Sequence, residues 1–141
     1  MSYTYLDHEA DIGIRCSGRN RAEAFEEGGR ALLNLVADPE RIRPERSFDV
    51  RCRASGLDTL FVEYLNEIIS LMGREDCVFS EVVILEIHRA GEEFLLKGTV
   101  RGEAIDPARH GLKTEIKAAT YFGLELTETD REVTLQCVLD I

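Results

Sequence analysis

Residues 59–72, TLFVEYLNEIISLM, carry the strongest structural signal in the chain. Apolar side chains recur there at the spacing of an α-helix, at Leu60, Phe61, Tyr64, Leu65, Ile68, Ile69 and Met72. A stripe this wide has to be covered by other elements, so the stretch predicts a helix packed on a sheet. Asp58 is placed to cap the start of this helix, and Gly73 to end it.

The residues on either side of this helix predict the rest of the fold. A second helix is expected at about 21–36, with Asn20 as its N-cap, Glu23 at the capping-box position, and an apolar stripe of Ala24, Phe25, Ala31, Leu32, Leu35 and Val36. Alternating patterns predict strands at 3–6, 12–17, 47–55, 123–126 and 132–139, with a long hairpin over 77–105 that turns at 90–92.

Two short stretches complete this assignment. Residues 106–111 are expected to form a loop, and residues 113–121 fit either a helical turn or a strand. Two strand–helix units followed by further strands predict the α+β class. We therefore expect one compact domain over residues 1–141, with a mostly antiparallel sheet and two main helices packed on it.

Composition limits the classes of function. The chain has 141 residues, 44% of them apolar, with no long apolar run and no signal-peptide pattern, so a soluble cytoplasmic protein without a membrane segment is expected. Its formal net charge of −10 argues against direct nucleic-acid binding and favours a cationic protein partner or a metal ion. The four cysteines form no CxxC pair, and reduced, buried thiols are expected.

Acidic groups gather at both ends of the chain. In an extended conformation Asp7, Glu9 and Asp11 share one face, with His8 on the other, and Asp140 stands beside the terminal residue Ile141. Clustered oxygens suit a hard cation such as Ca²⁺ or Mg²⁺. Taken alone, each cluster also fits a simpler interpretation, namely a solvated acidic turn, a frayed terminus, or a hydrogen-bonded structural role for His8.

A third polar group follows the expected loop. His110, Glu115 and Lys117 are types of residue that transfer protons, but no nucleophile with an activating base stands beside them. Glu115 and Lys117 share a face if the segment is extended, so an exposed ion pair is the simpler interpretation. No phosphate-binding glycine loop is present.

Three segments together resemble a known family. Residues 8–14, HEADIGI, are similar to the opening signature of the archease family, usually His-Thr-Ala-Asp-Ile-Gly, and residues 114–121, TEIKAATY, resemble its Thr-Glu-Ile-Lys-Ala-Val-Thr-Tyr block. A loop histidine, His110, precedes this block, and the chain ends in Asp-Ile as the family does. Order and spacing agree over essentially the whole chain. Glu9 replaces the usual threonine, and Phe122 stands where the family often has histidine.

This resemblance implies a non-enzymatic protein cofactor of the GTP-dependent tRNA-splicing RNA ligase. Such a cofactor promotes guanylylation of the ligase and its multiple turnover. The resemblance also implies a divalent ion held by Asp11, Asp140 and the backbone of Ile141, where the first and last strands meet, and a functional role for Lys117. The expected partner is the ligase itself, without direct contact to RNA.

Two alternatives remain open from the sequence. An acidic chaperone-like or scaffold protein would use its bulk charge to keep partners soluble. A metal-dependent phosphohydrolase or nuclease would use the same carboxylates on a phosphoester, but this class normally needs several bridging carboxylates and a basic substrate groove.

Overall fold

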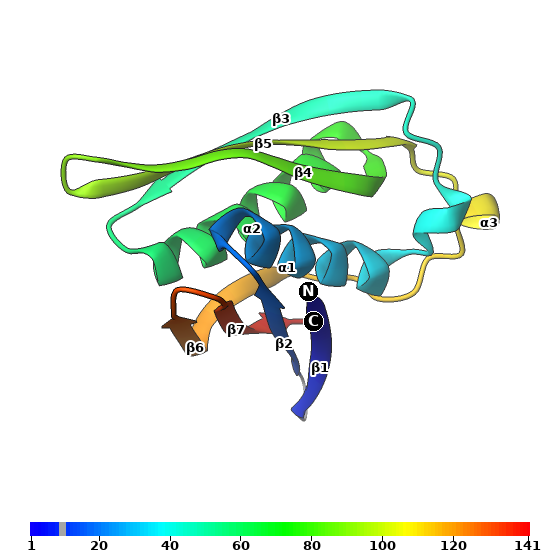
Figure 1. The fold of residues 1–141 in the computed structure, drawn as a ribbon. Helices are drawn as coiled ribbons and strands as arrows, with labels where there is room; N and C mark the ends of the chain where they lie inside the picture. Colours follow the sequence, from blue (N-terminus) through cyan, green and yellow to red (C-terminus); the bar gives the residue numbers. More distant parts are fainter. Residues whose placement is uncertain (9–10) are drawn as a thin grey trace.

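Two antiparallel sheets enclose a layer of helices in the computed structural model, which describes residues 1–8 and 11–141 (Figure 1). In chain order the elements are β1 (Ser2–His8), β2 (Asp11–Gly18), α1 (Arg21–Val36), the 3₁₀ turn η1 (Pro39–Arg41), β3 (Arg46–Ala54), α2 (Leu57–Glu75), β4 (Cys77–Ala90), β5 (Glu93–Ala104), α3 (Pro107–His110), β6 (Ala118–Glu128) and β7 (Val133–Asp140).

The strands divide between a larger and a smaller sheet. The four-stranded sheet has the order β1-β2-β7-β6, and the three-stranded sheet has the order β3-β5-β4. Every pairing is antiparallel. The predicted α+β class, antiparallel pairing and single compact domain are confirmed, whereas the division into two sheets had not been specified by the pattern.

Both helices lie between the sheets and contact both of them. Helix α1 packs on β2 and β4, and α2 packs on β3 and β6 (Figure 1). The aromatic rings at the centre come from both helices: the Phe25 ring lies 5.3 Å from that of Phe61 and 5.5 Å from that of Tyr64, centroid to centroid. Because α2 is covered on two sides, its buried residues extend around much of its circumference: Leu57, Leu60, Phe61, Val62, Tyr64, Leu65, Ile68 and Leu71.

The predicted bounds of α1 are confirmed, but its capping box is only half formed. Asn20 Oδ1 accepts the backbone N–H of Glu23 at 2.9 Å, as expected for an N-cap. The Glu23 carboxylate accepts the backbone N–H of Arg19 at 2.8 Å, one residue earlier than a capping box requires. Its ion pair with the Arg19 guanidinium explains this preference.

Helix α2 is longer at both ends than the pattern predicted. It begins at Leu57, because the Gly56 N–H donates to Thr59 Oγ1 and the Asp58 carboxylate accepts from the Thr59 N–H within the first turn. The prediction that Asp58 is the cap is therefore wrong. Gly73 does not end the helix either, since Asp76 adopts the left-handed conformation (φ 50°) that terminates it.

The last third of the chain also departs from the prediction. Pro107–His110 forms a short helix in the expected loop, and residues 112–117 have no regular structure. Strand β6 begins at Ala118 and runs through Gly123, where a positive φ of 66° accompanies a shift of register against β7. The predicted strand at 123–126 is thus confirmed but is longer at both ends, and residues 118–121 adopt the strand alternative.

No disulfide joins the four cysteines, in agreement with the prediction. Cys16, Cys77 and Cys137 are buried and Cys52 is half-buried. Burial raises the pKa of both Cys16 and Cys137 to about 12, so these thiols are unreactive at neutral pH. Within the described residues, no helix is both long and apolar enough to cross a lipid bilayer.

A close approach of the two helices generates a first prediction. A methyl group at Gly28 of α1 would overlap the ring of Phe61 and lie 3.1 Å from Cys16 Sγ. We expect Gly28→Ala to destabilise the protein by about 1–3 kcal/mol through overpacking. At Gly73, in the exposed last turns of α2, nothing lies within 4 Å of the added methyl.

The matched control, Gly73→Ala, should therefore stabilise the protein by up to about 1 kcal/mol through helix propensity alone. Urea unfolding of the two variants measures both effects. Equal shifts in the same direction would contradict the packing described for α1.

Candidate functional site

Strand β7 lies inside the four-stranded sheet and brings the end of the chain to the start of β2. Asp140 is paired across β7–β2 with Asp11 and across β7–β6 with Ala118. The Lys117 N–H donates to the Asp140 carbonyl at 2.9 Å, and Ile141 packs half-buried against the core. The acidic residue near each end and the 114–121 block thus meet at one place. It is the second strand, β2, and not the first, that meets the last strand there.

Asp11 and Asp140 face one another across two strands. Directly opposed residues of an antiparallel pair have Cβ atoms about 4.5–5.5 Å apart and project on the same face. Leu139 and Cys137 are buried against the helices, so alternation directs Asp140 and its partner Asp11 to the outer face. Two opposed carboxylates repel, and a cation between them would remove that repulsion.

The donors at this position fit a hard cation. Two carboxylates and the main-chain oxygens of Ile141 are all oxygen ligands, the type that Ca²⁺ and Mg²⁺ prefer. Across residues 1–8 and 11–141, however, no three His, Cys, Asp or Glu side chains lie close enough to hold a metal ion. A cation here would therefore depend on main-chain oxygens and water for the rest of its coordination.

Asp7 and Asp11 do not share one strand. Strands β1 and β2 are antiparallel, with His8 opposite Asp11 and Asp7 opposite Ile12. Asp7 and Asp11 therefore belong to different strands. Glu9, the carboxylate that distinguishes this chain from the family signature, lies outside the described residues.

Glu115 and Lys117 stand on either side of the buried Ile116 and are both exposed. They line a hollow of about 490 Å³ whose apolar wall comes from Val36, Ile69, Met72, Val78 and Ile105. No ion pair between these two described residues forms, so the predicted pairing is not present. Hydrogen bonds from the Thr114 N–H to Leu35 O and from the Lys117 N–H to Asp140 O hold the segment at both ends.

His110 has a structural role. It is fully buried, its Nδ1 accepts the backbone N–H of Asp106 at 2.9 Å, and its Nε2 lies 2.8 Å from Glu103 Oε1. With Nδ1 acting as acceptor, the Nε2–H is the donor to Glu103. Both ring nitrogens are thus engaged within the fold, and His110 is not available to a ligand.

Glu103 is the centre of this buried cluster. Its carboxylate accepts the Arg43 backbone N–H at 3.0 Å and contacts His110 and the Arg109 guanidinium. The Arg43 N–H first, then His110 and Arg109, lower the pKa of Glu103 from its ordinary 4.5 to about 2. The cluster connects the segment before β3 to the end of β5 and to α3, and so fixes the loop that leads to residues 112–117.

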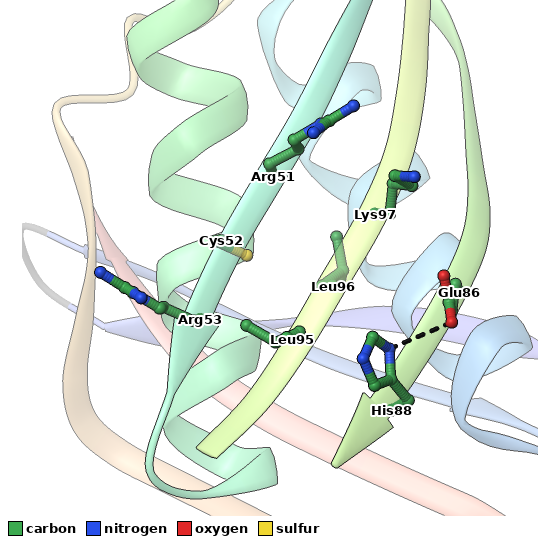
Figure 2. A pocket seen from close by; sticks show the side chains of 8 residues that line it. All are labelled: Arg51, Cys52, Arg53, Glu86, His88, Leu95, Leu96 and Lys97. Carbon is green, nitrogen blue, oxygen red and sulfur yellow. Dashed lines mark ion pairs between the residues drawn. The ribbon is translucent and has the colours of Figure 1, made fainter. Parts of the chain in front are cut away.

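A second hollow, of about 380 Å³, lies on the three-stranded sheet and had not been predicted (Figure 2). Arg51 and Arg53 of β3 and Lys97 of β5 contribute three cations to it, and Glu86 and His88 of β4 form an ion-pair contact of 3.1 Å. Composition could not reveal this cluster, because strand pairing alone brings residues 51 and 97 together.

Comparison with known proteins identifies close relatives. The sequence profile of the family described as "Archease protein family (MTH1598/TM1083)" matches residues 3–141. "Protein archease" of Methanosarcina mazei is 34% identical over 139 residues, which cover 99% of this chain and 95% of that protein.

Two solved structures share the fold. The solution structure of Methanobacterium thermoautotrophicum protein 1598 has a TM-score of 0.83 at 21% identity and covers 99% of this chain and 98% of that one. A Thermotoga maritima crystal structure, described as an archease and possible chaperone, has a TM-score of 0.60 at 22% identity and covers 96% and 94% of the two chains.

The buried carboxylate generates a second prediction. Because the folded-state pKa of Glu103 is about 2 and its ordinary value 4.5, its contribution to stability is complete above pH 4.5 and is lost as the pH falls to about 2. The Glu103→Gln variant has no titrating group at this position. Its free energy of unfolding should therefore decline less steeply than that of the wild type as the pH falls over this range. Urea unfolding at several pH values measures the two slopes.

The exposed Glu92, in the turn between β4 and β5, provides the matched substitution. Glu92→Gln should follow the wild-type slope. Equal slopes of unfolding free energy against pH for the wild type and Glu103→Gln would contradict the stabilising role described for the Glu103 carboxylate.

Proposed function

The chain belongs to the archease family, and on this premise we propose that it is a non-enzymatic activator of the GTP-dependent tRNA-splicing RNA ligase. In this role it promotes guanylylation of the ligase and lets the ligase turn over repeatedly. The observation that carries the proposal is the register that sets Asp11 opposite Asp140, with the Lys117 main chain bonded to the same residue.

This register is informative because the resemblance selects three segments that are far apart in the sequence. Asp11, Lys117 and Asp140 could have lain on separate faces, yet they gather around the end of β7. A site assembled from the start, the last third and the end of a chain depends on the whole fold. That dependence supports a shared role for these residues.

We further propose that Asp11, Asp140 and the main-chain oxygens of Ile141 hold a divalent cation, Ca²⁺ or Mg²⁺. Such an ion supplies concentrated positive charge that neutralises the two carboxylates and can attract phosphate oxygens. The chain itself positions the ligands: β2 and β7 fix the two carboxylates by register, and the Lys117 N–H orients the Asp140 peptide group.

Contact with the ligase would form around this end of β7. Lys117 and Glu115 provide charges at the rim of the hollow that α2 lines, and its apolar wall can accept an apolar side chain of the partner. His110 is the one histidine of the 110–117 group, and its two ring nitrogens contact Asp106 and Glu103. It is therefore not available for proton transfer to a substrate, which agrees with a non-enzymatic role.

A chaperone-like role is the second candidate. The Thermotoga maritima relative is described as a possible chaperone, and β6 of this chain exposes Tyr121 and Phe122, which are 55% and 69% accessible. Exposed aromatic side chains of this kind can contact unfolded chains. This candidate requires suppression of aggregation for unrelated proteins, with no dependence on Asp11 or Asp140.

The proposal generates a third prediction, on the carboxylates. Asp11→Asn or Asp140→Asn should remove divalent-ion binding, measured by titration calorimetry, and reduce multiple-turnover RNA ligation by the cognate ligase at least tenfold. Circular dichroism should show a retained fold, since both changes relieve repulsion between carboxylates.

Asp130→Asn, in the turn between β6 and β7, changes the net charge equally and should leave ligation unchanged. If Asp11→Asn and Asp130→Asn act alike, bulk charge and not a site is responsible, which favours the chaperone-like role. Hydrolysis of RNA by the purified protein alone, abolished by Asp11→Asn, would instead identify a phosphohydrolase.

A fourth prediction concerns the last residue. Because Ile141 packs against the core beside Asp140, four residues added after it should displace main-chain oxygens from the cation and weaken its binding at least tenfold. The same four residues added before Met1 are the control, since Met1 is exposed. Full cation binding and ligase stimulation with the C-terminal extension would exclude Ile141 as a ligand.

A further inference from the structure

The outer face of the three-stranded sheet presents charged side chains in register. Helices α1 and α2 cover one face of this sheet, and the other face is open in the described part of the chain (Figure 1). Register places Arg51, Lys97 and Glu86 in one row across β3, β5 and β4. Arg53, Leu95 and His88 form the next row, and these six side chains line the hollow of about 380 Å³ shown in Figure 2.

Arg51 and Lys97 are directly opposed like charges. Such a pair destabilises a sheet, because the Cβ atoms are only about 4.5–5.5 Å apart. Elsewhere on the same face the pairing is complementary, as between Glu81 and Arg101, whose charged groups lie 3.8 Å apart. Lys97 also faces Glu86 on its other side, on β4, so this row holds two cations and one carboxylate, and the cation left over points to a ligand that supplies negative charge.

The cations of the hollow are only weakly neutralised within the chain. Arg51 reaches Asp49 only at 4.0 Å, and Arg53 and Lys97 form no ion pair among the described residues. The carboxylate of Glu86 is directed at His88 Nδ1, 3.1 Å away (Figure 2). The hollow therefore has a local excess of positive charge on a chain whose net charge is −10.

We propose that this hollow binds the backbone of single-stranded RNA through Arg51, Arg53 and Lys97. Lys97 lies opposite Arg51, and Arg53 lies two positions further along β3, about 6.6 Å along the strand, so the long side chains can reach neighbouring phosphates of one chain. One guanidinium group can donate to two oxygens of the same phosphate, which suits Arg51 and Arg53 to this role. The hollow is open, which fits an extended polymer. RNA binding at this place would be a function separate from ligase activation.

Glu86 is a hydrogen-bond acceptor in the hollow, so the hollow suits a ligand that carries hydrogen-bond donors beside its negative charges. RNA carries hydrogen-bond donors, the 2′-hydroxyl and the base amino groups, beside its phosphates. Glu86 and His88 can accept and donate to these groups, and Leu95 provides an apolar surface between them and Arg53. The outer face has no aromatic side chain in these two rows, so binding should depend on the backbone and not on the base sequence.

Fluorescence anisotropy with a labelled 12-nucleotide RNA of mixed sequence tests the proposal, without ligase or divalent ion. Three phosphate contacts predict a slope of about −2 for log K against log salt concentration, which is a loss of about 20-fold in affinity between 50 and 200 mM salt. The double variant Arg51→Ala/Lys97→Ala should bind at least tenfold more weakly at 50 mM and lose only about threefold over the same salt range. Its unfolding temperature should be unchanged or higher, because the opposed cations are gone.

Arg74→Ala/Arg131→Ala removes two charges outside the hollow and should bind as the wild type does. Absence of RNA binding at 50 mM salt, or equal loss in the two double variants, would overturn the proposal. Equal affinity for DNA of the same sequence would remove the role of the 2′-hydroxyl and overturn the assignment to RNA. Competition by oligoglutamate at matched charge would assign the hollow to acidic protein segments instead. None of these results depends on ligase activation, so the two proposals fail independently.

Discussion

The insertion of β7 between β2 and β6 is the constraint on which the rest of the structure depends. It closes the four-stranded sheet, covers one side of both helices through Leu135, Cys137 and Leu139, and holds the last residues in place by pairing on both sides. Without it, β2 would be an edge strand paired with β1 alone, β6 would lose its partner in this sheet, and the residues around Asp140 would not be held together.

Each sheet has a destabilising pair of like charges on its outer face. Asp11 opposes Asp140 on one sheet, and Arg51 opposes Lys97 on the other, so each sheet carries a pair of like charges directly across two strands. The helix layer separates these two pairs (Figure 1). A bound cation can relieve the repulsion between the two carboxylates, and a bound anion can relieve that between the two basic side chains. The molecule would then hold ligands of opposite charge on its two outer faces.

Local chemistry made the helices predictable, and long-range pairing made the sites unpredictable. The bounds of α1 follow from Asn20 and the apolar period, whereas α2 gains residues at both ends because Thr59 bonds Gly56 and Asp76 adopts a left-handed conformation. The gathering of Asp11 with Asp140 came from the family resemblance. Arg51 and Lys97 gave no signal, since only the register of β3 on β5 makes them neighbours.

The β2–β7 pairing also determines the order in which the chain can fold. Its partners are more than a hundred residues apart, so their meeting carries a large loop-closure entropy. The β4–β5 hairpin, by contrast, closes through the two residues Gly91 and Glu92 and costs little entropy to start. The three-stranded sheet and the helices can therefore form a nucleus early, and docking of β7 is the slow, late event. We expect slower docking of β7 to leave the apolar inner faces of β2 and β6 exposed for longer and so to favour aggregation.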